Sequence, residues 1–266
     1  MRNSALKNSF FNIVKRRKFI CSVCGQSIKR FLPLDSFYAE NAKKYGYKYF
    51  GQGETINLES YLCPVCGATD RERLYSLYID KFVLNEKVAD DTSPKLSLLH
   101  FAPDKALAQK ITTDGFFQYR SADLLMEGVD DKIDITNLYI YKDSYFDCFI
   151  CSHVLEHVTD DTKALRELFR IIKPGGWGIL MVPIIPSLIH THEDYTKTTE
   201  EERWQFFGQG DHVRLYAKDD FISLTERAGF VVEQFNVKKF GEKIFKTHGI
   251  ALGSVLYIAK KACSNI

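Results

Sequence analysis

Two matching cysteine pairs near the start of the chain restrict its fold more than any other feature. They read Cys21-Ser-Val-Cys24-Gly and Cys63-Pro-Val-Cys66-Gly. A Cys-x2-Cys turn directs both sulfurs at one point, and the glycine that follows allows the tight backbone. Two such turns supply the four thiolates of the tetrahedral set that zinc prefers, which favours a metal site over redox pairs or chance turns. The sequence therefore predicts a structural zinc bound by Cys21, Cys24, Cys63 and Cys66, with a loop of 38 residues (25–62) between the pairs.

Charged residues are unevenly distributed along the chain. The 36 Lys and Arg against 34 Asp and Glu give a formal net charge of +2, which excludes a globally basic nucleic-acid coat. Residues 1–34 hold eight of the basic side chains and no Asp or Glu, so residues 35–266 carry 28 basic (36 minus 8) against 34 acidic groups. Some of this basic excess lies beside the cysteine pairs, where cations favour thiolates. The other basic residues of this arm, together with the apolar and basic segment 10–19, would also suit peripheral contact with a membrane surface, and this alternative stays open.

The chain carries no sign of export or of membrane insertion. No apolar run reaches the roughly 18–20 residues of a membrane span. The basic cluster follows the first apolar residues instead of preceding them, unlike a secretory signal. We therefore expect a cytoplasmic protein whose cysteines are reduced or bound to metal.

The chain divides into two regions of different composition. We expect residues 1–90 to form a zinc-binding subdomain with a basic arm and a connecting helix, and residues 91–266 to form a larger domain. In the larger domain, apolar strand-like segments alternate with helical periods. This alternation predicts an α/β fold with a largely parallel sheet, whose ligands bind beyond the carboxyl ends of the strands. The expected strands are 95–101, 116–121, 146–152, 177–182, 230–237 and 253–259, and the expected helices are 103–111, 162–172 and 219–228.

Six sequence motifs in a fixed order resemble one enzyme family. They are LLHFAPD (98–104), YRSADL (119–124), DKIDITNL (131–138), SYFDCFICSHVLEHV (144–158), LRELFRIIKPGGWGILMVP (165–183) and FGQGDHVRLY (207–216). Together, over about residues 95–260, they resemble the class I S-adenosylmethionine-dependent methyltransferases, specifically the bacterial methyltransferase-11-like group. The cysteine pairs look like the zinc-binding extension of one branch of that group. The resemblance implies a Rossmann-like sheet that is mostly parallel with an antiparallel last strand, and S-adenosylmethionine as the cofactor.

The resemblance also implies which residues bind the cofactor. The first strand-to-helix turn, beside the methionine part, is Phe101, Ala102, Pro103 and Asp104. Asp123 matches the acidic residue that binds the ribose hydroxyls, with Leu124 beside the adenine. Asp134 and Ile135 match the pair that flanks the adenine amino group, and Ser152 and His153 fall next to the methyl-bearing sulfonium. The chain departs from the family in its first turn, where HFAPDKA replaces the usual glycine-rich loop.

Histidines around a predicted lid are the candidates for catalysis. The segment 183–210 is long and polar, and we expect it to cover the acceptor side of the cofactor. His212 follows it and is our first candidate for a general base, with Asp211 to orient it; the alternative is that His212 only anchors the lid. His153 is a second candidate, although it is also expected as part of the cofactor wall. Glu156 is expected to face solvent or to pair locally.

Three functions from different classes fit the sequence. The first is a methyltransferase that acts on a hydroxyl of a small molecule or glycoconjugate. The second is an RNA methyltransferase that docks RNA through the zinc module, with the aromatic rings of Tyr45, Tyr47, Tyr49 and Phe50 available for base stacking. The net acidic body and the absence of an NPPY-like tetrapeptide after the expected strand 146–152 argue against RNA. The third is a non-catalytic partner protein with a methyltransferase-like body.

Overall fold

The computed structural model describes residues 19–84 and 94–263. The first 18 residues lie outside the described residues. They include most of the basic arm and most of the segment 10–19, for which we left membrane contact open. Among the residues that are described, no helix combines the length and the apolar character needed to cross a membrane.

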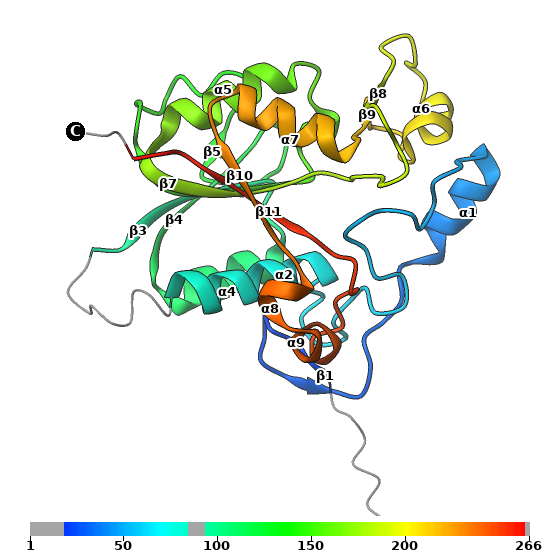
Figure 1. Ribbon diagram of the computed structural model, residues 1–266, viewed down its shortest axis with the longest axis horizontal. Helices are drawn as coiled ribbons and strands as arrows, with labels where there is room; N and C mark the ends of the chain where they lie inside the picture. Colours follow the sequence, from blue (N-terminus) through cyan, green and yellow to red (C-terminus); the bar gives the residue numbers. More distant parts are fainter. Residues whose placement is uncertain (1–18, 85–93, 264–266) are drawn as a thin grey trace, which may run out of the picture.

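A seven-stranded sheet forms the centre of the molecule, in the order β10-β11-β7-β6-β3-β4-β5 (Figure 1). Neighbouring strands from β5 to β7 run parallel, whereas β11 runs antiparallel to both β7 and β10. The expected sheet, mostly parallel with an antiparallel last strand, is therefore confirmed. The strands are β3 (Leu96–Phe101), β4 (Phe117–Asp123), β5 (Asp131–Lys132), β6 (Phe146–Ser152), β7 (Ile172–Met181), β10 (Val231–Phe235) and β11 (Leu256–Lys260).

Apolar sequence places β6 at the middle of this sheet. Four consecutive residues, 148–151, are completely buried, as expected for a central parallel strand covered on both faces. Helices α5 (Asp161–Ile171) and α7 (Lys218–Arg227) cover one face, and α2 (Asp70–Tyr78) and α4 (Lys105–Asp114) cover the other (Figure 1). A π-helical turn, η1 (Ile79–Leu84), continues α2. Two short helices, α8 (Val237–Phe240) and α9 (Glu242–Thr247), lie between β10 and β11 in the chain.

The N-terminal lobe consists of the hairpin β1 (Phe19–Ile20) and β2 (Ser27–Ile28), the two cysteine turns and helix α1 (Ser36–Tyr45). The segment after β7 was predicted to be a lid, and there the chain forms the strand pair β8 (His192–Glu193) and β9 (Arg214–Leu215) and helix α6 (Glu200–Phe207). Helix α1 packs on α6, where the Trp204 ring lies 5.9 Å from Phe37 and 6.1 Å from Tyr45, between ring centroids (Figure 1). The lobe and the lid region are thus in direct contact.

One buried guanidinium connects the N-terminal lobe to the sheet domain. Arg73 of α2 is 0% exposed and donates to five backbone carbonyls, those of Ser60, Tyr61, Ala68, His248 and Gly249. Its guanidinium also lies 3.7 Å from the ring centroid of Phe31. Gly249 has a positive φ of 63°, and a Cβ there would meet the Phe31 ring at 2.4 Å, so only glycine fits. Arg73 therefore ties the 60–68 loop to the segment that precedes β11.

Replacing this arginine by lysine is expected to destabilise the whole protein. An ammonium group has three donors and no planar fork, so Arg73→Lys leaves at least two buried carbonyls without a partner. Each buried group left unpaired costs about 1–3 kcal/mol, so we expect a loss of about 3 kcal/mol or more in the free energy of unfolding. Urea unfolding followed by circular dichroism measures this loss.

The matched control for that measurement is Arg30→Lys, since Arg30 is an exposed arginine of the same lobe. This variant should unfold within about 0.5 kcal/mol of the wild type. An Arg73→Lys protein as stable as the control would mean that the five hydrogen bonds do not hold the lobe in place.

Candidate functional site

The four predicted metal ligands converge at one point of the N-terminal lobe. The Sγ atoms of Cys21, Cys24, Cys63 and Cys66 all lie within 4.8 Å of one another. Sγ of Cys21 is 3.7 Å from Sγ of Cys66, and Sγ of Cys24 is 3.9 Å from Sγ of Cys63. A tetrahedron with Zn–S bonds of about 2.3 Å has S–S edges of about 3.8 Å, so this donor set fits a zinc ion.

Matching backbone turns bring the sulfurs together. The N–H of Gly25 donates to the carbonyl of Cys21 at 2.8 Å, and the N–H of Gly67 donates to the carbonyl of Cys63 at 2.9 Å. Both glycines have positive φ, 70° and 76°, which is the conformation that this turn requires. The first turn is also fixed to α2, because the hydroxyl of Ser22 donates to the carbonyl of Arg73.

A second site lies at the carboxyl ends of β3, β4 and β6, where a cavity of about 470 Å³ opens. This volume is within the range of roughly 300–1,000 Å³ of small-molecule sites. The predicted cofactor residues that line it are Phe101, Ala102, Asp123, Leu124, Asp134, Ile135 and His153. Further lining residues that the sequence reasoning did not assign to the cofactor include Leu125, Ile133, His157 and Asp211.

Three predicted cofactor residues, Pro103, Asp104 and Ser152, are not among those that line the cavity. Asp104 precedes helix α4, and burial raises the pKa of its carboxyl while Arg71 of α2 opposes that shift. The hydroxyl of Ser152 lies 2.8 Å from the hydroxyl of Tyr75, also from α2. The helix after the cysteine turns thus supplies side chains behind the first loop, and no local sequence signal marked Arg71 or Tyr75 for that position.

The glycine-free first loop adopts a conformation that usually needs glycine. Ala102 has φ of 44° and His153, at the end of β6, has φ of 56°. Left-handed backbone at a residue other than glycine costs about 1–3 kcal/mol and occurs mainly at functional sites. The N–H of Ala102 donates to the carbonyl of Ala122 in β4 at 3.0 Å, which holds the loop in this shape. The chain therefore keeps the turn without glycine, at the cost of strain in two residues that line the cavity.

Backbone amides hold the carboxylates of Asp123 and Asp134 at the cavity wall. Oδ1 of Asp123 accepts from the N–H groups of Leu125 and Met126, both at 2.7 Å. Oδ1 of Asp134 accepts from the N–H of Thr136 at 2.8 Å. Each carboxylate thus caps its own loop and is held at the cavity wall.

A carboxylate surrounded by histidines lies next to the cavity. Nδ1 of His153 is 2.9 Å from Oε1 of Glu156, Nδ1 of His157 is 3.3 Å from Oδ2 of Asp211, and the rings of His157 and His212 are 4.8 Å apart. Glu156 has His153 as a local neighbour, although not in a hydrogen bond of normal geometry, and the alternative that it faces solvent is wrong, because it is 0% exposed. His212 is 3% exposed and lies behind the cavity wall instead of lining it.

Burial sets the protonation of this cluster. It lowers the pKa values of both His153 and His212, and the charge of Glu156 opposes part of each shift. Burial also raises the pKa of Glu156, but the three neighbouring imidazoles outweigh this and lower it. The site therefore contains an ionised, buried carboxylate beside the largely neutral imidazoles of His153 and His212 at pH 7.

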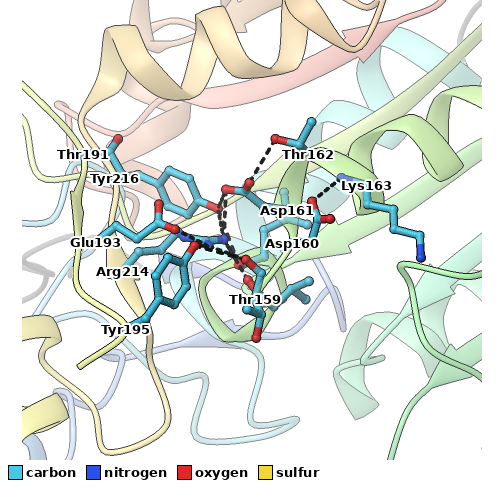
Figure 2. Close-up of polar contacts among 12 residues, drawn as sticks. Thr159, Asp160, Asp161, Thr162, Lys163, Thr191, Glu193, Tyr195, Arg214 and Tyr216 are labelled. Atoms are coloured by element: carbon cyan, nitrogen blue, oxygen red, sulfur yellow. Dashed lines mark hydrogen bonds and ion pairs between the residues drawn. The ribbon is translucent and has the colours of Figure 1, made fainter. Parts of the chain in front are cut away.

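A second buried arginine holds the strand pair β8–β9 against residues 158–161, which follow His157 in the chain (Figure 2). Arg214 of β9 is ion-paired with Asp161 at 2.9 Å and with Glu193 of β8 at 3.1 Å. It also donates to the carbonyls of Val158 and Thr159, at 2.8 and 2.9 Å. These residues directly follow η2 (Leu155–His157), the 3-10 turn that carries Glu156, so Arg214 fixes the distance between that turn and His212.

A family model and known methyltransferases match parts of the chain. The methyltransferase domain family model matches residues 69–234. Ubiquinone/menaquinone biosynthesis C-methyltransferase UbiE of Vibrio cholerae is 41% identical over 102 residues, which are 34% of this chain and 39% of that protein. The Francisella tularensis protein of the same name is 41% identical over 59 residues, 21% of this chain and 24% of that protein. The chain thus covers at most 39% of the length of these two relatives.

A solved S-adenosylmethionine-dependent methyltransferase from Archaeoglobus fulgidus has 15% identity and a TM-score of 0.43, over 70% of this chain and 99% of that one. The match to the family model, residues 69–234, spans more than half of the 266 residues and includes all of the strands β3, β4 and β6 whose ends form the cavity. The chain belongs to the family of S-adenosylmethionine-dependent methyltransferase domains.

Proposed function

We propose that this protein transfers a methyl group from S-adenosylmethionine to a hydroxyl of a small molecule or glycoconjugate. The observation that carries the proposal is the cavity at the strand ends, which has fixed carboxylates on one side and the histidine-glutamate cluster on the other. The cofactor supplies an electrophilic methyl group on a sulfonium. The acceptor oxygen forms a bond to the methyl carbon while the S–CH₃ bond breaks, and its electron pair stays on sulfur to give a neutral thioether.

Residues of this chain would bind and orient the cofactor. Asp123 is the candidate for accepting hydrogen bonds from the ribose hydroxyls, with Leu124 beside the adenine and Asp134 and Ile135 flanking its amino group. The strained backbone at Ala102 lets the chain approach the methionine part closely. Pro103, Asp104 and Ser152 would act behind this surface by shaping the loops.

The histidines would act on the acceptor side. His153 is our candidate for taking the hydroxyl proton, because it lines the cavity and burial keeps its imidazole neutral. His212 was the first candidate from the sequence, but it is buried behind the wall, and its Nδ1 lies 3.2 Å from the carbonyl of Phe207. We therefore do not assign the hydroxyl proton to His212, which lies beside Glu156 and His157.

Removing the charge of Asp123 is expected to weaken cofactor binding. Asp123→Asn retains an oxygen that accepts from the loop amides but loses the charge-assisted bonds to the ribose, worth about 1.5–3 kcal/mol. Calorimetry with S-adenosylhomocysteine should show affinity roughly 10–100-fold below that of the wild type. The matched control is Glu127→Gln, an 87% exposed carboxylate of the same loop that does not line the cavity. Unchanged binding by Asp123→Asn would remove the ribose assignment, and no heat with the wild type would favour the non-catalytic alternative.

Methyl transfer itself is tested with acceptors of different chemistry. Radiolabelled S-adenosylmethionine is incubated with sugars, lipid-linked sugars and RNA, and we expect label in a hydroxyl-bearing sugar. His153→Ala should lower kcat by roughly 100-fold, the contribution of a general base, while binding S-adenosylhomocysteine normally. His192→Ala, an exposed histidine of the lid region, should retain turnover. Label on a ring carbon of a quinone precursor would replace the hydroxyl proposal with the chemistry named for the UbiE relatives.

The RNA alternative loses support from the residues that suggested it. The ring of Tyr45 stacks on Trp204, and Tyr47 and Tyr49 pack against the buried cluster of Ile185, Phe207 and Leu215. These three rings are therefore occupied by contacts inside the protein, and of the four rings only that of Phe50 is exposed. Label in RNA in the acceptor screen, with retention that falls steeply as salt rises, would restore this alternative.

We further propose that the four cysteines bind one structural zinc. Four thiolates close the coordination shell, so the ion would stabilise the lobe without taking part in catalysis. Elemental analysis of the wild type should give one zinc per chain, and Cys66→Ser should lose most of it and lower the Tm. Cys263→Ser, which changes an exposed cysteine outside the cluster, should keep both the zinc and the Tm. A metal-free wild type with the same Tm as the metal-loaded protein would rule out a structural ion.

A further inference from the structure

The histidine-glutamate cluster has the composition of a second metal site. One carboxylate oxygen of Glu156 and one ring nitrogen each of His157 and His212 lie within 4.8 Å of one another. Glu156 and His157 come from η2, directly after β6, and His212 comes from the loop that precedes β9. The N–H of Val213 donates to the carbonyl of Glu156 at 2.9 Å, so the two segments are held together by backbone as well as by Arg214.

Glu156 lacks the partners that a buried carboxylate needs. It is 0% exposed, and within the described part of the chain neither of its side-chain oxygens accepts a hydrogen bond of normal geometry. Nδ1 of His153 comes within 2.9 Å of Oε1 but outside that geometry. The groups that face this carboxylate are imidazoles, the commonest metal ligands. A cation bound there would coordinate a carboxylate oxygen that accepts no hydrogen bond of normal geometry from the residues that the structure describes.

Both imidazoles are oriented as metal-binding histidines usually are. Nδ1 of His212 lies 3.2 Å from the carbonyl of Phe207, and Nδ1 of His157 lies 3.3 Å from Oδ2 of Asp211. Histidine ligands typically donate their second ring N–H to a carbonyl or carboxylate in this way, which fixes the ring and makes the other nitrogen a better donor. Nε2 of each ring is therefore the nitrogen left for a cation, and Asp211 is a positioning residue.

We propose that Glu156, His157 and His212 bind a divalent first-row transition-metal ion, and that this ion binds an oxygen of the methyl acceptor. Two imidazoles and one carboxylate suit ions of the Mn²⁺ and Fe²⁺ type and leave open coordination positions. His157 and Asp211 line the cofactor cavity, so these positions face the acceptor side. This role rests on the proposed function, and it narrows the acceptor to a molecule with a metal-binding hydroxyl, such as a vicinal diol.

Metal binding is tested without reference to activity. MnCl₂ is titrated into the full-length protein, and free Mn²⁺ is measured by its paramagnetic resonance signal. Mn²⁺ prefers oxygen and nitrogen ligands, so the four-cysteine cluster does not compete for it. We expect one Mn²⁺ per chain. Loss of a group that only supports a metal ligand weakens binding roughly 10–100-fold. We therefore expect at least this loss of affinity in each of the variants Glu156→Gln, His157→Ala and His212→Ala.

The controls separate loss of a ligand from loss of the fold. His157 is partly exposed, so His157→Ala should fold even if Glu156→Gln does not. His190→Ala, which removes an 84% exposed histidine of the lid region, should bind Mn²⁺ like the wild type. No binding by the wild type, or binding that survives in both Glu156→Gln and His157→Ala, would overturn the metal site.

Water proton relaxation tests whether the bound ion can also bind an oxygen of the methyl acceptor. An ion with open positions carries exchangeable water, so bound Mn²⁺ should raise the longitudinal relaxation rate of solvent protons well above that of free Mn²⁺. A soluble vicinal diol acceptor found in the methyl-transfer screen should lower this enhancement by displacing water. Bound Mn²⁺ without exchangeable water would overturn the acceptor role. Mn²⁺ binding in a protein that fails to bind S-adenosylhomocysteine would refute the methyltransferase proposal and leave the metal site standing.

Discussion

The buried guanidinium of Arg73 holds the N-terminal lobe on the sheet domain. Its acceptors are all neutral carbonyls, from the loop before the second cysteine pair and from the segment before β11. Its charge is therefore compensated at longer range, by the carboxylates of Asp70 and Glu72 and by Cys21 and Cys63 in their thiolate form. A zinc-bound set of four thiolates carries a net charge of −2, so metal binding and arginine burial would favour each other. The lobe and the domain then become one cooperative unit.

Helix α2 belongs both to the N-terminal lobe and to the sheet domain. Its first turn carries Arg73 and a capping box between Thr69 and Glu72, and the Glu72 carboxylate also accepts from the N–H of Leu107 in α4. Its last turns bury Leu74, Tyr75 and Tyr78 in the same cluster as the central sheet. The helix that follows the cysteine turns therefore also covers the methyltransferase sheet, and its Tyr75 contacts Ser152 at the end of β6, behind the cavity.

The sequence predicted those features of the molecule that depend on a few adjacent residues. The cysteine pairs, the strand β6 and the carboxylate at Asp123 each follow from a few adjacent residues, and the structure has them where the sequence predicted. Glu156 shows where such reasoning fails. The sequence predicted that Glu156 faces solvent or pairs locally, but Glu156 is buried and lies close to His212, which is more than 50 residues later in the chain. Arg73 was missed because its partners are backbone carbonyls, which sequence does not distinguish. Arg214 was missed because its partners, among them the Asp161 carboxylate and the Val158 carbonyl, lie more than 50 residues earlier in the chain.

The contact between α1 and α6 links the two candidate sites. Trp204 packs on two rings of the N-terminal lobe, and a Cβ at Gly208 would meet the ring of Tyr47 at 2.6 Å, so lobe and lid region interlock without space for a side chain. His212 follows this interlocked segment by four residues and owes its position to it. The N-terminal lobe thus supports the His212 segment from outside, although none of its residues lines the cavity. Helix α1, which does not contribute a side chain to either site, in this way holds the segment that places His212 beside Glu156 and His157.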